Sequence, residues 1–74
     1  MKNQIRELRR ALRVSQGELA ARVGVTRQTI ISLENEKYTA SLALAYKIAR
    51  FFGCRIEDVF DFAEIEEEFQ NGTI

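Results

Sequence analysis

The sequence contains no histidine, no proline, no tryptophan and a single cysteine. Without histidine or a second cysteine, the common nucleophile–base pairs and zinc sites cannot form, and the chain has no glycine-rich phosphate loop. The glutamates near the C-terminus also lack the spacing of a calcium loop. We therefore expect no enzyme activity, no metal and no cofactor. Cys54, next to Phe51 and Phe52, is expected to be a small core residue.

Long hydrophobic runs are also missing. No apolar run approaches the roughly 20 residues that cross a bilayer, and the N-terminus carries no cleavable signal pattern. We expect no membrane partner and a cytoplasmic location. No alternating apolar run is long enough for a sheet, while 46% of the 74 residues are hydrophobic. These features predict one compact all-α domain.

Residues 16–35 carry small and apolar side chains at the helical period on both sides of a glycine. Gly24 suits a sharp turn because glycine adopts positive φ without a steric penalty. Two short helices that cross steeply at this turn form a helix-turn-helix, and Ala20 is small where they would cross. The apolar residues on the two buried faces are Leu19, Ala20 and Val23 before the turn, and Ile30 and Leu33 after it.

Both of these helices have marked beginnings. Ser15, followed by Glu18 three residues later, predicts a capping box, and Thr26 predicts the cap of the second helix. Ser41 predicts a cap for a fourth helix that Gly53 ends. Local signals for helix starts and stops therefore agree with the periodicity.

The stretch resembles the Cro and phage-repressor type of helix-turn-helix domain, the XRE family, over residues 3–60. The resemblance rests on Gln16, Glu18-Leu19-Ala20, Val23-Gly24-Val25, Thr26, Gln28, Ile30, Leu33-Glu34-Asn35 and Lys37. It implies five short helices, with the third in the DNA major groove, and a dimeric regulator of transcription. We expect a DNA-binding domain at residues 1–60 and a short acidic and apolar C-terminal extension at residues 61–74.

Side chains near the start of the recognition helix, residues 26–35, should meet base edges where they do not face the core. Gln28 can pair with adenine, and Arg27 can present its fork to guanine or hold only a phosphate. Ile31 suits a thymine methyl group, although a plain exposed isoleucine is a comparable interpretation. Ser32 completes the predicted base-contacting set.

Phosphate contacts should fix the register on DNA. Gln16 and Thr26 lie at helix starts, where side chains and free N–H groups can hold an anionic oxygen. The resemblance adds the loop after the recognition helix, although Glu36 stands where the family commonly has glycine. Arg10 contacts either phosphate or solvent. The predicted loop contacts are Asn35, Lys37 and Tyr38.

In similar repressor domains, the residues at the positions of Arg9 and Glu34 form an ion pair that joins the first helix to the end of the third. We expect a structural role for this pair. Removing one partner of a buried pair can cost about 3 to 5 kcal/mol because it leaves an uncompensated charge. Loss of Glu34 should therefore unfold the domain.

The zero net charge conceals two opposite halves. Residues 1–50 contain ten basic and four acidic residues, a net charge of +6, whereas residues 51–74 contain one basic and seven acidic residues, a net charge of −6. This asymmetry favours a basic face for DNA and an acidic far end. Ordinary solvated surface is the alternative interpretation.

Two flanking helices are predicted from their apolar periodicity. The first, at residues 3–12, should bury Ile5, Leu8 and Leu12. A short fifth helix should begin at Ile56 behind a weak cap at Arg55. The fourth helix should bury Leu42, Ala45, Ile48, Ala49 and Phe52.

Residues 63–70 could form a short helix with Ile65 and Phe69 on one stripe. Such a helix is not stable alone, so it should join a partner chain, pack back on its own domain, or fray. We favour a homodimer through Phe60, Phe62, Ile65 and Phe69, with residues 60–62 pairing as a strand as a second route. Two recognition helices would then read a palindromic operator.

The alternative function is that of an antitoxin or adaptor that uses the same fold and binds a basic protein partner through the acidic C-terminal segment. The leading hypothesis is a sequence-specific regulator of transcription that binds double-stranded DNA, with a repressor as the expected role.

Overall fold

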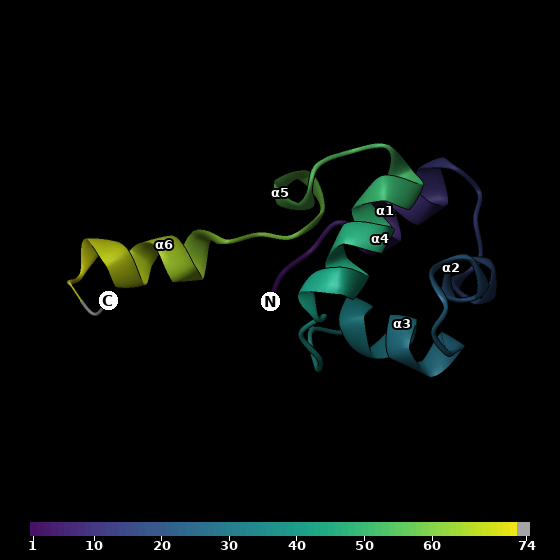
Figure 1. The fold of residues 1–74 in the computed structure, drawn as a ribbon, viewed down its shortest axis with the longest axis horizontal. Helices are drawn as coiled ribbons and strands as arrows, with labels where there is room; N and C mark the ends of the chain where they lie inside the picture. Colours follow the sequence, from purple (N-terminus) through teal and green to yellow (C-terminus); the bar gives the residue numbers. More distant parts are fainter. Residues whose placement is uncertain (73–74) are drawn as a thin grey trace.

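The computed structural model describes residues 1–72, and this part of the chain contains six helices and no strand beyond a single bridge. An all-α fold is therefore confirmed. Figure 1 shows the first five helices gathered into one body, with the sixth projecting from it. The helices are α1 (Ile5–Ala11), α2 (Gln16–Val23), α3 (Arg27–Glu34), α4 (Leu42–Phe52), α5 (Ile56–Val59) and α6 (Ala63–Gln70). None of these described helices is long and apolar enough to span a bilayer.

The core lies where α1 to α5 meet. Its apolar side chains come from all five helices, and burying each one fully stabilises the fold by about 1.5 to 3 kcal/mol. Ala20 is 3% exposed, as expected where α2 and α3 pack together. The largest fully buried side chains are Ile5, Leu19, Ile30, Leu33, Ile48 and Val59.

Three helix caps are confirmed. The hydroxyls of Ser15, Thr26 and Ser41 each accept a hydrogen bond from the backbone N–H three residues later, at 3.0, 3.3 and 3.2 Å. The bond from the Glu18 carboxylate back to the Ser15 N–H is absent from the described part of the chain, so only half of that capping box forms. The caps fix where α2, α3 and α4 begin.

The turn between α2 and α3 depends on the conformation of Gly24, whose φ is +76°. A Cβ at this position would meet no atom within 4 Å, so backbone conformation and not space explains the glycine. Gly53 ends α4 in the same way, with φ of +71°. Both predicted stops are confirmed.

Two other positive-φ positions are held by residues with side chains, Arg13 at +57° and Glu36 at +61°. Each follows a helix end and closes it with the two backbone bonds of a Schellman motif. After α3, the Glu36 N–H donates to the Leu33 carbonyl at 3.0 Å and the Lys37 N–H donates to the Ser32 carbonyl at 2.9 Å. Glu36 therefore takes a conformation that usually belongs to glycine.

Two predicted core positions are wrong. Leu12 is 55% exposed because α1 ends at Ala11. Leu12 therefore lies outside the helix and does not continue its buried stripe. Leu42 is 80% exposed because it is the first residue of α4 and points outward, while Leu44 is buried in its place. Phe52 is only half-buried.

The two ends of the five-helix body pair with each other. Asn3 and Phe60 form an isolated antiparallel bridge. The Gln4 N–H donates to the Val59 carbonyl at 2.7 Å, and the Asp61 N–H donates to the Lys2 carbonyl at 2.8 Å. Helix α1 consequently begins later than predicted, at Ile5.

This pairing corrects the predicted dimer surface. The side chain of Phe60 is 4% exposed and belongs to the core of its own domain. Its backbone lies against Asn3 of the same chain, so the edge that faces Asn3 is already occupied in this structure. Phe62 also packs partly on the core.

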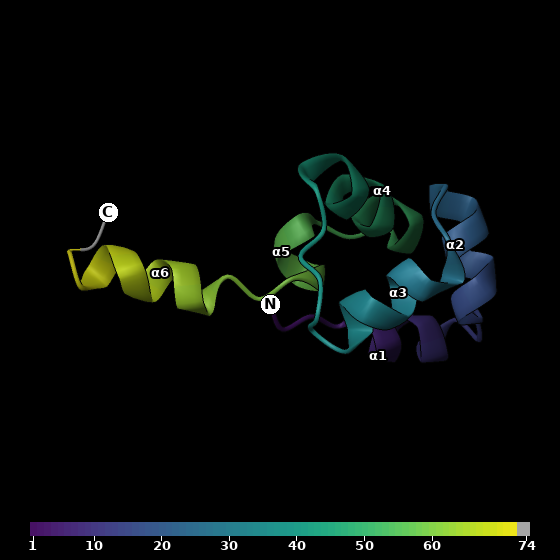
Figure 2. The same cartoon turned by 90° about the horizontal axis from the view of Figure 1, so that it is seen from below.

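The predicted last helix is present as α6, and it does not pack back on the body. No residue of α6 is buried, with Ile65 38% and Phe69 57% exposed. Figures 1 and 2, two perpendicular views, both show α6 extending away from the other helices. Of the extension at 61–74, residues 73 and 74 lie outside the described residues.

Candidate nucleic-acid interface

Helix α3 presents one face to the core and the other to the surface. Ile30 and Leu33 are buried, whereas Arg27 and Gln28 are exposed. At 100° per residue, the predicted base-contacting side chains share the outward side, with Ile31 between Arg27 and Gln28. Ile31 and Ser32 are half-buried. The caps at both ends of α3 hold this face in one orientation.

A basic hollow of about 660 Å³ lies on the Arg27 side of α3. It includes the first turn of α2, where free backbone N–H groups favour an anionic oxygen. Four arginines and no acidic residue line it. Arg10 and Arg27 have no ion pair within residues 1–72, so their charges are available to a ligand. The lining residues are Arg6, Arg9, Arg10, Ser15, Gln16, Gly17 and Arg27.

A smaller hollow of about 250 Å³ lies on the other flank of α3. It brings together five of the predicted DNA-contacting residues from the cap, the helix and the following loop. The lining residues are Thr26, Gln28, Thr29, Ser32, Lys37 and Tyr38. Asn35 is not among them, because its Oδ1 accepts a hydrogen bond from Arg6 Nη2 at 3.2 Å and so faces α1.

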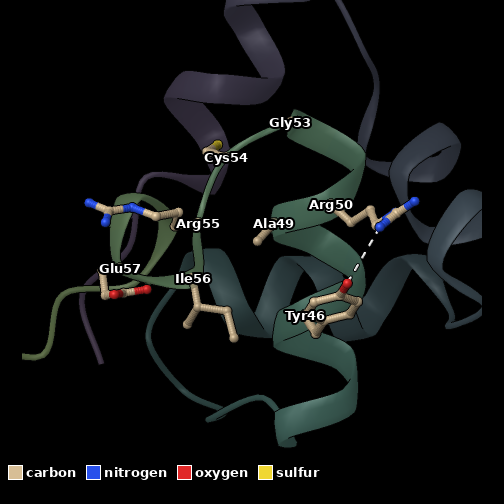
Figure 3. A pocket seen from close by; sticks show the side chains of 8 residues that line it. All are labelled: Tyr46, Ala49, Arg50, Gly53, Cys54, Arg55, Ile56 and Glu57. Atoms are coloured by element: carbon tan, nitrogen blue, oxygen red, sulfur yellow. Dashed lines mark hydrogen bonds between the residues drawn. The ribbon is translucent and has the colours of Figure 1, made fainter.

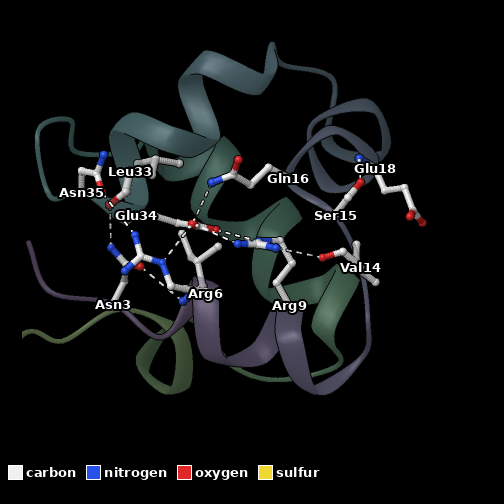
Figure 4. A network of polar contacts seen from close by, with 11 residues as sticks. Asn3, Arg6, Arg9, Val14, Ser15, Gln16, Glu18, Leu33, Glu34 and Asn35 are labelled. Atoms are coloured by element: carbon white, nitrogen blue, oxygen red, sulfur yellow. Dashed lines mark hydrogen bonds and ion pairs between the residues drawn. The ribbon is translucent and has the colours of Figure 1, made fainter.

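Behind these hollows, the Glu34 carboxylate is the centre of a polar network (Figure 4). Arg9 donates from Nε to Oε2 at 2.8 Å and from Nη2 to Oε1 at 3.2 Å, which makes a bidentate ion pair. Gln16 Nε2 donates to Oε1 at 3.1 Å, and Arg6 Nε donates to it at 3.4 Å. The side chain of Glu34 is fully buried, so its charge depends on these partners.

Burial alone would raise the pKa of Glu34. The hydrogen bonds from Arg9 and Gln16, with the positive charges of Arg9 and Arg6, outweigh burial and lower the pKa below its ordinary value of 4.5. Glu34 is therefore an anion at neutral pH. It connects α1, the start of α2 and the end of α3, and so sets the position of the outward face of α3.

The network contains one residue that sequence reasoning missed. Arg6 contacts both Glu34 and Asn35 from α1. It stands three residues before Arg9, so the two arginines share one face of the helix. This spacing of Arg6 and Arg9 was the sequence signal that could have predicted the role of Arg6. Asn3 adds a hydrogen bond from Nδ2 to the Leu33 carbonyl at 2.9 Å, which ties the N-terminal segment to the end of α3.

Within residues 1–72, no group of three or more histidine, cysteine, aspartate or glutamate residues is placed to hold a metal ion. Cys54 is a free, half-buried thiol packed against the core.

Comparison with known proteins matches residues 5–59 to a family described as helix-turn-helix. This range covers α1 to α5 and spans most of the chain. The chain is a member of the XRE-type helix-turn-helix family. Membership of this family implies DNA binding.

Relatives of this XRE-type domain occur in archaea and bacteria. A protein of Archaeoglobus fulgidus is 54% identical over 66 residues, which cover 89% of this chain and 93% of that protein. A Methanocaldococcus jannaschii protein is 48% identical, over 89% of this chain and its own full length. A Bacillus subtilis protein is 48% identical over 81% of this chain and 91% of its own. Each is described as an uncharacterized HTH-type transcriptional regulator.

Proposed function

We propose that this chain is a regulator of transcription that reads double-stranded DNA sequence with α3 in the major groove. The observation that carries the proposal is the outward face of α3, flanked by a basic hollow on one side and a polar hollow on the other. A convex helix with cationic and hydrogen-bonding flanks matches the shape and charge of a major groove. The family of regulators to which the chain belongs is in general not enzymatic.

Base reading falls to the outward side chains of α3. Gln28 is exposed on this face, where its amide can pair with N6 and N7 of adenine. Arg27, exposed one residue earlier, can form a fork to guanine, and Ile31 can contact a thymine methyl group. Each good pair contributes about 1 to 3 kcal/mol of discrimination. Ser32 is a smaller polar contact at the same face.

Phosphate contacts fall to the two hollows. Arg10 and Gln16 line the basic hollow, and Thr26, Lys37 and Tyr38 line the polar one. Because these groups lie on both flanks of α3, they would hold one strand on each side of the groove. Asn35 would join them only by turning away from Arg6.

A second copy would double the sequence that is read. One short recognition helix contacts few base pairs, whereas two that are related by a two-fold axis read half-sites about one DNA turn apart. We therefore propose a homodimer on a palindromic operator, with a repressor as the expected regulatory role. The five-helix domain at residues 1–60 binds DNA in this scheme, and the extension contributes to the dimer.

The test is selection of bound fragments from a random duplex library at physiological salt. The parent chain is compared with the double variant R27A/Q28A and with K47A, a control that removes a positive charge from α4 outside both hollows. We expect the parent and K47A to enrich the same inverted repeat and the double variant to lose it. Failure of the parent to enrich any sequence would remove DNA reading and favour the antitoxin or adaptor function.

A further inference from the structure

A groove of about 500 Å³ runs between α4 and α5 on a surface that the DNA-reading face does not use (Figure 3). Its floor is apolar and is formed by Ala49, with Ile56 and Cys54 beside it. The rim carries Arg50 on one side and Arg55 on the other, and Figure 3 shows these guanidinium groups pointing apart. An apolar groove that carries a cation on each side suits an apolar helix face with acidic flanks.

Helix α6 of the same chain has these properties. Ile65 and Phe69 lie one turn apart on one stripe, and both are exposed. At 100° per residue, Glu66 and Glu68 flank this stripe on its two sides, whereas Glu64 and Glu67 lie behind it. The apolar edge of α6 is therefore bordered by one carboxylate on each side.

The lengths also agree. The groove follows α4 from Tyr46 to Gly53, and α6 has eight residues, so both extend roughly 10 to 12 Å along a helix axis. An eight-residue helix is not stable in water without a packing surface. Helix α6 finds no such surface on its own domain.

The charges at the rim are open to an acidic partner. The Arg50 side chain donates a hydrogen bond from Nη1 to the Tyr46 hydroxyl at 3.4 Å and has no ion pair within the described chain. Arg55 has one exposed ion pair with Asp58 at 3.7 Å, which is weak. Glu57 is the single acidic residue of the lining, so the lining residues carry a net charge of +1, while Asp58, outside the lining, is the partner of Arg55.

The start of α6 directs the helix away from the groove of its own chain. The Asp61 N–H is bonded to the Lys2 carbonyl, and the Asp61 Oδ1 accepts from the Ala63 N–H at 2.8 Å. Phe62 packs partly on the core. Turning α6 back would break these contacts, whereas a groove on another molecule can receive α6 where it stands.

We propose that two copies of this chain exchange α6, each helix lying in the α4–α5 groove of the other copy. Ile65 and Phe69 cover the apolar floor, and Glu66 and Glu68 face Arg50 and Arg55. The opposite charges of the two halves of the chain make each copy complementary to the other. This inference rests on the proposed dimeric regulator, for which it supplies the interface.

The test is a charge exchange, measured by sedimentation equilibrium of the full chain without DNA. Variant E66K/E68K places positive charges on α6 against the arginines of the groove. Variant R50E/R55E places negative charges in the groove against Glu66 and Glu68. We expect each variant alone to weaken dimerisation by about tenfold or more. An equimolar mixture should form a tight heterodimer, because both exchanged helices then meet a groove of opposite charge.

The matched control is E64K/E67K, which changes charge equally on the rear of α6 and should keep the parent dimer. Circular dichroism checks the fold of every variant, and all the substituted residues are exposed. A monomeric parent, a dimer that E66K/E68K leaves intact, or a mixture that fails to associate would overturn the exchange. The library selection is a separate measurement, so a chain that enriches DNA but fails here would refute only the interface.

Discussion

Arg9 and Glu34 meet through two parallel N–H···O bonds of 2.8 and 3.2 Å, so α1 is bound to the last turn of α3. The side chain of Glu34 is fully buried, and that of Arg9 is 12% exposed. Gln16, at the start of α2, shares the same carboxylate. The three helices nearest to the predicted DNA face are therefore positioned by one anion.

The first prediction concerns the loss of this anion. We expect E34Q to lower the free energy of unfolding by about 3 to 5 kcal/mol, because Arg9 would keep a mostly buried charge without a counter-ion. R6A is the comparison, since the Arg6 side chain is 41% exposed and its contact with Glu34 is longer. That variant should lose about 1 kcal/mol or less. Urea denaturation measures both free energies of unfolding. Equal losses would contradict the conclusion that the buried Arg9–Glu34 pair stabilises the domain more than Arg6 does.

The second prediction is a pH dependence. Because the pKa of Glu34 in the folded chain lies below its ordinary value of 4.5, the unfolded chain binds more protons as the pH falls. The stabilisation by ionised Glu34 is thus complete above about pH 5 and is lost as the pH falls through the folded pKa. Denaturation from pH 3 to 7 should show a stability difference between parent and E34Q that shrinks toward low pH. A constant difference would refute the coupling.

The third prediction concerns Glu36, which holds a positive φ at the end of α3. E36G should stabilise the domain by about 1 kcal/mol, because the left-handed conformation strains a residue with a Cβ. It should also strengthen DNA binding, since a carboxylate beside the polar hollow is removed. E36A separates the two effects. It removes the charge but keeps the strain, so it should strengthen binding without raising the melting temperature.

The fourth prediction distinguishes the two roles at the DNA face. R27A should relax base preference at one operator position, with a cost of about 1 to 3 kcal/mol there. R10A should weaken all duplexes alike and reduce the log–log salt slope by about one unit. Binding titrations on the selected operator and on a scrambled duplex at several salt concentrations check both. A uniform loss with R27A would assign that residue to a phosphate.

The fifth prediction concerns the extension. A chain that ends after Phe62 keeps the Asn3–Phe60 bridge and the core, so its helical fold and melting temperature should change little. It lacks α6, and it should be monomeric and bind the inverted repeat more weakly than the full chain. A change of at least tenfold in apparent affinity is expected from losing the second recognition helix. Full affinity and dimer mass after this truncation would show that α6 has no role in assembly.

The helix-turn-helix could be predicted from the sequence because its signals are local. Ser15, Thr26 and Gly24 act on the backbone within a few residues of themselves, and the apolar spacing of α2 and α3 agrees with them. The exposed face of α3 followed from the same periodicity. Local capping and periodicity were sufficient to predict α2 and α3 because no contact with a distant segment changes these helices.

Distant contacts account for the errors. Leu42 fits an apolar stripe by spacing, yet its place at the start of α4 leaves it exposed and Leu44 takes the core position. Phe60 looked available to a second copy until the pairing with Asn3 placed it in its own core. The left-handed conformation of Arg13 has no local sequence signal, because neither glycine nor asparagine stands there.

The bridge between Asn3 and Phe60 also has a kinetic consequence. The contacts of α2 with α3 join neighbouring segments and can form quickly, whereas the bridge closes a loop that includes nearly the whole five-helix body. During synthesis, the helix-turn-helix can therefore assemble while the partner of Asn3 is still to be made. Only when residue 61 has emerged can the Lys2 carbonyl receive its hydrogen bond and fix the direction in which α6 leaves. The order of translation thus delays pairing between copies until each domain is closed.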